Sequence, residues 1–428
     1  MKQRLSLAVS AAALLLAGLI GPGRLCLARE EPAPAETGCL ANLCRRDSLT
    51  GDWFGLGRTV AESGLSVHLG LTEVYQLNLE GGLATHRHAG RYAGSYDLEA
   101  ELDLEKLFRI TGGTFFVLAE GSWSDGLDAS SVGSLLGIND DAAGDRAIDV
   151  TEAWYEQALL GGRLIVRIGK IDLTGGFQCR GCPVAFDASL YANDETTQFL
   201  ASALVNNPTI PFPDNGLGAA VYLEPAEGFY LAAGAQDAQA DARETGFRTA
   251  FHEEDHVFAI FETGLVPNLL ALPGAYRAGF WYDPQPKERF RGGVKRDDVG
   301  LYLSCDQMLH KENTDADDTQ GLGVFARFGC ADSDVNEIHS FWSAGGQVRG
   351  LIPGRDDDVL ALGVAQGLLS RDAEPGRTSR ETVLEMYYSA AVCGWLNVSG
   401  HLQYVDNPGG RHDVDDAVVV GVRVQMNF

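Results

Sequence analysis

The side chains with the clearest chemical potential recur at every second position of one short segment. Glu152, Trp154 and Glu156 are spaced two residues apart, and Arg163 and Arg167 stand in the segment that follows. Carboxylate and guanidinium groups can hydrogen-bond the hydroxyls of a small polar molecule, and an indole ring can cover an apolar C–H face. Glu152, Trp154, Glu156 and Arg167 together therefore predict contacts with a small polar ring. The alternative is a group of ion pairs that stiffens a wall, with Trp154 at a membrane interface.

A second acidic series has the same spacing further upstream. Within Tyr96–Glu105 every odd-numbered residue is acidic, and every even-numbered one is apolar or aromatic. A helix would scatter both sets around its axis, so the segment is predicted to be a strand with one acidic face and one apolar face. Glu120 lies opposite to Val117 and Ala119 in the next segment and belongs to the same kind of polar face.

Segments with this two-residue period fill most of the chain. About sixteen of them begin near residues 65, 94, 113, 149, 163, 216, 228, 255, 276, 296, 321, 337, 357, 381, 395 and 415. Most run about 9–14 residues, longer than the usual strand of about 5–6 and suited to a tilted crossing of a bilayer. The last segment alternates up to a terminal Phe, as outer-membrane barrels generally do. We therefore predict an all-β protein, an antiparallel transmembrane β-barrel of about sixteen strands.

The connections between these segments tend to alternate between short and long. Leu160–Gly162 and Pro225–Glu227 are short, whereas Ser124–Ile148 and Thr174–Asn215 are long. Outer-membrane barrels have this asymmetry, with short periplasmic turns and long outer loops. The stretch Asp306–Gln320 is predicted to be a long connection where the alternation requires a short one. The two longest loops are expected to fold inward and to narrow any pore.

The N-terminus has the pattern of an export signal. Lys2 and Arg4 precede an uncharged run from Leu5 to Ile20, and Cys26 and Ala28 complete a small-x-small cleavage site. The run is shorter than the roughly 20 residues that a membrane-spanning helix needs. We therefore predict a cleaved signal peptide over residues 1–28, a periplasmic leader over 29–63 with a short helix between Thr50 and Ser63, and an outer-membrane barrel over 64–428.

The charge balance limits the partners of the chain. Its 428 residues include 33 basic and 59 acidic side chains, a net charge of −26 at pH 7. Such a field repels phosphate, which argues against nucleic acid as a partner. After the first 28 residues no stretch approaches 18 consecutive apolar residues, so helical membrane spans are excluded. Outer-membrane lipid would therefore contact strands.

Seven cysteines follow the predicted cleavage site, and the odd number leaves at least one without a partner inside the chain. Cys39 with Cys44 and Cys179 with Cys182 are the obvious local pairs. An exported chain meets an oxidising compartment, which favours disulfides. The sequence does not determine how these seven residues are connected.

One motif points to a different chemistry. Residues His252 to His256 match the H-E-x-x-H pattern of zinc proteases. That motif works when a helix places both histidines one turn apart, but here the segment runs directly into a predicted strand. A solvated loop is therefore the better interpretation.

Several segments, taken in order, resemble one family. They are Leu49–Leu56, Ser95–Lys106, Trp154–Gln157, Arg167–Lys170, Asn206–Pro208, Gly350–Arg355 and Leu402–Gly410. Together they resemble the carbohydrate-selective porins of the OprB type, from about residue 49 to the C-terminus. The resemblance implies a sixteen-stranded barrel in the bacterial outer membrane through which sugars diffuse. The cysteines depart from the pattern of the family.

In such a barrel the polar face of each strand lines a water-filled lumen, and the apolar face contacts lipid. The predicted pore-lining residues, beside Asp97, are Glu99, Glu101, Asp103, Glu120, Glu152, Trp154, Glu156, Arg163 and Arg167. We predict passive diffusion of sugars and other small polar solutes, with no catalytic residue, cofactor or metal. The alternatives are a secreted all-β carbohydrate-binding or hydrolytic protein, and a structural outer-membrane barrel with a plugged pore. Assembly into a homo-oligomer is left open.

Overall fold

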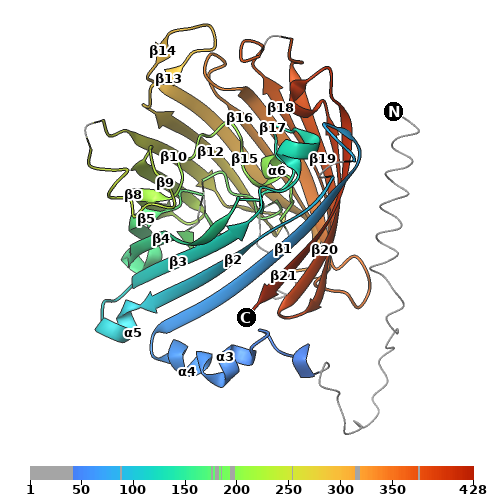
Figure 1. The fold of residues 1–428 in the computed structure, drawn as a ribbon. Helices are drawn as coiled ribbons and strands as arrows, with labels where there is room; N and C mark the ends of the chain where they lie inside the picture. Colours follow the sequence, from blue (N-terminus) through green and yellow to red (C-terminus); the bar gives the residue numbers. More distant parts are fainter. Residues whose placement is uncertain are drawn as a thin grey trace.

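The computed structural model is a closed antiparallel barrel of sixteen long strands (Figure 1). It describes residues 42–86, 89–174, 177–178, 183–184, 186–192, 198–252, 254–313, 319–374 and 376–428. The barrel strands are β1 (Leu65–Gly82), β2 (Gly90–Asp103), β3 (Gly113–Trp123), β4 (Arg146–Leu159), β5 (Leu164–Ile171), β8 (Gly216–Ala226), β9 (Phe229–Asp237), β10 (Val257–Leu265), β12 (Leu272–Asp283), β15 (Asp298–Lys311), β16 (Gly321–Cys330), β17 (Ile338–Arg349), β18 (Val359–Leu369), β19 (Arg380–Cys393), β20 (Leu396–Asp406) and β21 (Asp415–Asn427). The predicted fold class is confirmed.

The first and last strands close the barrel. β1 pairs with β2 on one side and with β21 on the other, where Leu71 lies opposite Met426. The backbone N–H of Phe428 donates to the carbonyl of Leu69 at 3.0 Å, so the ladder continues to the last residue. Closure leaves none of the sixteen described barrel strands with an unpaired edge, which is the condition for placing a sheet in lipid.

The connections are short at one end of the barrel and mostly long at the other. At the short end they range from two residues (227–228) to nine, and at the other end the longest runs from 172 to 215. The prediction of a long loop over Asp306–Gln320 was wrong, because β15 continues to Lys311. Asp306 belongs to the wall, where its carboxylate pairs with Arg277 at 2.7 Å. A charged residue on the inner face is compatible with a strand when it has a partner across the sheet.

The short elements belong to the leader and to the connections between the barrel strands. They are α3 (Gly51–Gly55), α4 (Gly57–Glu62), α5 (Leu104–Phe108), α6 (Ser202–Val205), η1 (Asp128–Val132), η2 (Leu160–Gly162), η3 (Pro408–Gly410) and the two-residue strands β6 (Phe177–Gln178), β7 (Pro183–Val184), β11 (Asn268–Leu269), β13 (Lys287–Glu288) and β14 (Val294–Lys295). Helices α3 and α4 lie below the short-turn end, on the same side as the C-terminus (Figure 1). Gly64, with φ +102°, then turns the chain into β1. The predicted signal peptide lies outside the described residues.

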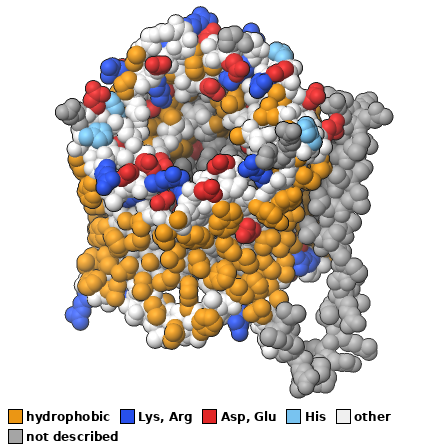
Figure 2. Space-filling model, in the orientation of Figure 1, with side chains coloured by type: hydrophobic (Ala, Val, Ile, Leu, Met, Phe, Trp, Pro, Cys, Tyr) orange, Lys and Arg blue, Asp and Glu red, His pale blue; other side chains and the backbone are white. Residues whose placement is uncertain are grey.

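The face of the barrel in Figure 2 carries a broad apolar band on its outer surface. Alternation produces it directly, because neighbouring residues on a strand point to opposite faces. On β21, for example, Val422 is 37% exposed on the outer face, whereas the next residue, Arg423, is fully buried inside. Charged side chains gather above the band, around a hollow (Figure 2). No helix in the described ranges is long and apolar enough to cross a membrane.

Two long loops fold into the lumen and cover part of the inner wall. In the loop 124–145, Leu136 and Ile138 pack with Phe199 and Leu204 of the loop 172–215 against the inner faces of β16–β21. Further residues of the second loop, among them Phe186, pack against β5–β12. Part of the inner wall is therefore covered by apolar packing against these loops, in contrast to the simple rule of a polar interior.

Candidate functional site

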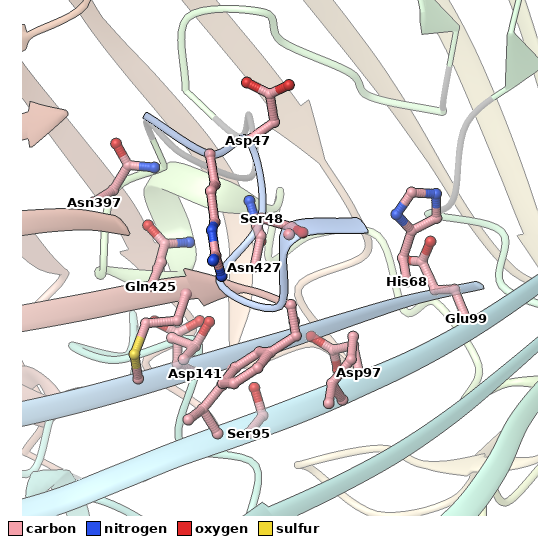
Figure 3. A pocket seen from close by; sticks show the side chains of 18 of the residues that line it. Asp47, Ser48, His68, Ser95, Asp97, Glu99, Asp141, Asn397, Gln425 and Asn427 are labelled. Atoms are coloured by element: carbon pink, nitrogen blue, oxygen red, sulfur yellow. The ribbon is translucent and has the colours of Figure 1, made fainter. Parts of the chain in front are cut away.

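A polar cavity with a volume of about 860 Å³ lies at the short-turn end of the barrel. Its lining comes from three sources: strands β1, β2, β20 and β21, the leader before β1, and the tips of the two inward loops. The lining residues that carry polar groups include Arg45, Arg46, Asp47, Ser48, Arg58, His68, Thr72, Ser95, Asp97, Glu99, Asp141, Gln198, Asn397, Gln425 and Asn427. Figure 3 shows Asp47 and Ser48 on the leader, across the cavity from Asp97 and Glu99 on β2.

The predicted acids of β2 and β3 lie on the wall of this lumen. Asp97 and Glu99 line the cavity itself. Asp97 lies opposite Glu120 of β3 in the ladder, and Glu120 lies opposite Asp149 of β4. Three carboxylates thus stand in a row across three neighbouring strands, all of them partly exposed. Such a row attracts cations into the water beside it, because like charges on a low-dielectric wall reinforce one another.

Three predicted residues lie nearer the short-turn rim. Glu101 is exposed, one inward-facing position beyond Glu99. Asp103 ends β2 and caps α5, since its carboxylate accepts the backbone N–H groups of Glu105 and Lys106 at 3.0 and 3.1 Å. Arg163 precedes β5 in the turn and lies beside a smaller recess together with Glu224 and Glu227, away from the main cavity.

The remaining predicted residues form one compact cluster on β4 and β5. The indole N–H of Trp154 donates to Glu152 at 2.8 Å, and the Arg167 guanidinium donates twice to Glu156, at 3.0 and 2.8 Å. Arg167 also covers one face of the Trp154 ring, 3.9 Å from its centroid. Phe116 stacks on the same ring at a centroid distance of 4.8 Å. Because Trp154 is only 8% exposed, a sugar could reach its face only after displacing a neighbour.

Buried charged residues of the wall hold the two inward loops. The two carboxylate oxygens of Glu385 accept the backbone N–H groups of Leu200 and Ala201 at 2.9 and 2.8 Å. Arg423 donates to the Gln198 carbonyl at 2.7 Å and lies 3.6 Å from the Asp141 carboxylate. Arg423 therefore contacts both loops at the point where their tips, Asp141 and Gln198, line the cavity.

Glu381 holds the loop 124–145 in the same way. Its carboxylate accepts the backbone N–H groups of Leu135 and Leu136 at 3.0 and 3.2 Å, together with that of Gly409 at 2.7 Å. The side-chain oxygen of Ser134 is a fourth partner. Charged groups that lose their water inside a protein need such a full set of hydrogen bonds.

The comparisons with known proteins agree with this architecture. Residues 87–428 match the family described as "Carbohydrate-selective porin, OprB family". The chain belongs to the OprB family. It is therefore an outer-membrane porin, and the predicted recognition is confirmed.

Several relatives of this porin align with it over nearly the whole length of both chains. Porin B of Pseudomonas aeruginosa is 24% identical over 423 residues, covering 89% of this chain and 91% of that protein. A putative porin, QuiX of Acinetobacter baylyi, is 22% identical over 421 residues, covering 90% and 93% respectively. The high-pH structure of Pseudomonas putida OprB superposes with a TM-score of 0.75 at 21% identity, covering 90% of this chain and 99% of that one.

The leader of this porin supplies pore-lining residues that the sequence analysis missed. Arg45, Arg46 and Arg58 line the main cavity although they precede the first strand. They face the same space as Asp97 and Glu99, so that positive and negative groups share one aqueous mouth. The only local signal for them was the presence of basic residues in a leader that is followed by an acidic barrel.

Within the porin, Ser399, His401 and Glu385 form a chain of hydrogen bonds. The Ser399 hydroxyl contacts His401 Nε2 at 2.8 Å, and His401 Nδ1 contacts Glu385 at 2.8 Å. The order matches that of a Ser-His-acid triad, but Ser399 is only 2% exposed and both partners are buried. Since Glu385 also binds the backbone of Leu200 and Ala201, we assign this chain to holding the loop 172–215.

Burial changes the titration of carboxyl groups in the inward loops. Burial raises the pKa of Asp140 to about 6, and the nearby Asp141 carboxylate adds to this shift. Burial also raises the pKa of Asp187 to about 7, although Arg327 acts to lower it. A raised carboxyl pKa means that the packed loop binds its proton more tightly than a released loop. Protonation therefore stabilises the packed loops progressively as the pH falls below about 7.

The zinc-protease motif of this porin lies in the outer loop 238–256. His252 pairs with Asp255 at 3.0 Å, and the backbone N–H of His256 donates to Gln239. Among the described residues no group of three or more histidine, cysteine or acidic side chains has the arrangement of a metal site.

Replacing Trp154 by Ala is expected to destabilise the barrel while leaving sugar flux per folded channel unchanged. The change removes a ring packed between Phe116 and Arg167, and such truncations cost about 3–5 kcal/mol. The temperature at which the folded barrel unfolds, followed by gel mobility, measures the first effect, and liposome swelling measures the second. Trp342→Ala is the control, because Trp342 is 39% exposed on the outer face. Reduced sugar flux with unchanged stability would instead indicate a direct contact between Trp154 and sugar.

Proposed function

We propose that this porin lets neutral sugars and other small polar solutes diffuse passively across the outer membrane. The observation that supports this proposal most directly is the cavity of about 860 Å³ at the mouth of the barrel, which is lined by carboxylates, guanidinium groups and side-chain amides. These groups can replace the water around sugar hydroxyls, and a volume in this range accommodates small organic molecules, whose sites measure about 300–1,000 Å³. Family membership supports the same solute class.

The path that we propose passes between the inward loops and the polar wall of β1–β4. Asp141 and Gln198 form its border on the loop side, and Asp97 and Glu99 form its border on the strand side. Arg45, Arg46 and Arg58 lie where it opens at the short-turn end. Acidic and basic groups across one passage order the water between them, which favours solutes that can exchange hydrogen bonds with it over apolar ones.

We further propose that the chain is exported with residues 1–28 as a signal peptide that is removed after about Ala28. The charged start, the uncharged run and the small residues before the cleavage site support this. The transport that we propose involves no covalent step, so no side chain has a catalytic role in it. A secreted carbohydrate hydrolase is disfavoured, because a closed barrel with an apolar outer band suits lipid.

A plugged structural barrel is the second candidate function, because the two inward loops occupy much of the lumen with apolar contacts. Liposome swelling with the refolded mature chain separates the two candidates. We expect swelling with glucose, slower swelling with a disaccharide, and slower swelling with uncharged polyols than with sugars of matched size. Equal rates for polyols and sugars would indicate a general sieve. Absence of swelling by inserted protein would overturn the transport proposal in favour of a plugged barrel.

A further inference from the structure

Two cysteines that are far apart in the sequence meet at the mouth of the barrel. Cys44 belongs to the leader and Cys393 ends β19, yet the two thiols lie close enough to interact, because Leu43 and Arg46 on either side of Cys44 contact Trp395 and Gly394 beside Cys393. No disulfide joins them in this structure. The other two described cysteines, Cys305 and Cys330, lie on the outer faces of β15 and β16, where they are matched in the ladder with Ala326 and Leu301.

The backbone around this pair is held in place independently of the thiols. The Trp395 indole N–H donates to the carbonyl of Leu43 at 3.0 Å. The Cα of Gly394 lies so close to the carbonyl of Arg46 that an added Cβ would stand 2.9 Å from that oxygen. The leader thus runs across the β19–β20 turn on both sides of Cys44. The meeting of the two thiols is a feature of the packed backbone.

We propose that Cys44 and Cys393 form a disulfide in the exported protein, which fastens the leader to the barrel at the pore mouth. The short-turn end of such a barrel faces the periplasm, an oxidising compartment. The bond would close a covalent loop that contains nearly all of the barrel strands. It would also hold the residues that directly follow Cys44 in place. Those residues are Arg45 and Arg46, which line the cavity.

The chemistry requires an oxidant, and a periplasmic protein with a reactive disulfide is the chemical class that supplies it. One thiolate of the pair attacks that disulfide and forms a mixed disulfide, and the second thiolate then attacks the first cysteine's sulfur. One S–S bond forms in the porin, and one breaks in the oxidant, which leaves as a dithiol. Two electrons and two protons pass from the cysteine pair to the oxidant.

The cross-link can be mapped without any transport measurement. Protein from outer membranes is alkylated before unfolding, digested with trypsin and analysed by mass spectrometry without reduction. The sequence predicts one peptide, 30–45, that carries Cys39 and Cys44, and another, 381–411, that carries Cys393. We expect these two peptides to be joined, with Cys39→Ser retaining the link and Cys44→Ser losing it. The Cys305→Ser/Cys330→Ser variant is the matched control and should retain it.

Three results would overturn the proposal: a Cys39–Cys44 bond inside the first peptide, a Cys39–Cys393 bond, or alkylation of both Cys44 and Cys393. The effect on the pore rests on the proposed function and is tested separately. A reductant added to the short-turn side should alter single-channel conductance in the wild-type porin but not in Cys44→Ser/Cys393→Ser. If the cross-link is mapped but reductant leaves the conductance unchanged, the disulfide exists and does not influence transport. If the protein forms no channel at all, the proposed function is wrong and the disulfide proposal is unaffected.

Discussion

Replacing Glu385 by Leu is expected to raise single-channel conductance several-fold and to reduce discrimination between small and large sugars. The change leaves the backbone N–H groups of Leu200 and Ala201, and the side chains of His401 and Gln403, without their acceptor. An unsatisfied buried donor costs about 1–3 kcal/mol, so four of them cost roughly 4–12 kcal/mol. The two main apolar anchors of that stretch, Phe199 and Leu204, contribute only about 3–6 kcal/mol together. The loop should therefore leave the wall and widen the passage.

Two controls separate the release of the loop from a general loss of folding. Glu385→Gln keeps the shape and one acceptor oxygen, so its conductance should lie between those of the wild type and the leucine variant. Glu120→Gln removes a partly exposed carboxylate from the same lumen without touching a loop anchor, and its size discrimination should be unchanged. Planar-bilayer recording and liposome swelling provide the measurements. Wild-type conductance in a stably folded Glu385→Leu porin would show that the loop does not limit the pore.

Replacing the three leader arginines by glutamate, which reverses their charge, is expected to make the porin several-fold more selective for cations over anions. Arg45, Arg46 and Arg58 are exposed at the cavity that also contains Asp97 and Glu99. A unit charge about 5 Å from a permeating ion contributes about 0.8 kcal/mol in water, and salt screens it beyond about 10 Å at 0.1 M. Arg45→Glu/Arg46→Glu/Arg58→Glu should therefore shift the reversal potential in a KCl gradient strongly toward that of potassium.

The opposite change and the salt dependence test the same electrostatic explanation. Asp97→Asn/Glu120→Gln/Asp149→Asn should lower the preference for cations, because it neutralises the row of carboxylates across β2–β4. Arg411→Glu, in an exposed outer loop where Arg411 pairs with Asp413, should leave selectivity unchanged. At 1 M salt the screening length falls to about 3 Å, and the effects of both triple variants should become small. Selectivity that persists at 1 M salt would contradict a charge effect of this kind.

The barrel itself could be predicted because its pattern is local. Each strand alternates with period two, and thus the lipid-facing side can be read from a few neighbouring residues, as in Leu98 beside Asp97 or Val422 beside Arg423. Predicted strand starts fall within four residues of the observed ones along the whole chain. The prediction of a long connection from Asp306 was wrong because the polar residues there continue the strand. Asp306 pairs with Arg277 on the neighbouring strand instead of starting a loop.

The interior depended on contacts between residues that are far apart in the sequence. Alternation places Trp154, Phe341 and Tyr387 on inner faces, but it cannot tell whether water or a folded-in loop covers them. Loop residues such as Phe199 and Leu204 provide that cover, and buried acids such as Glu385 hold the loops through backbone groups that carry no sequence signature. The side chains of Glu152, Trp154, Glu156 and Arg167 lie together in the structure, but their burial was not predictable, and their role in contacting sugar stays a prediction.

The sequence by itself thus determined the strands, their approximate number, the apolar outer face and the family resemblance. All of these follow from short-range periodicity or from ordered motifs. Only the tertiary structure decided where the aqueous cavity lies, that the leader arginines border it, and that Cys44 meets Cys393. The reason is physical: barrel closure brings the leader beside the β19–β20 turn, so Leu43 and Trp395 touch across 352 positions, and no local pattern encodes such a contact.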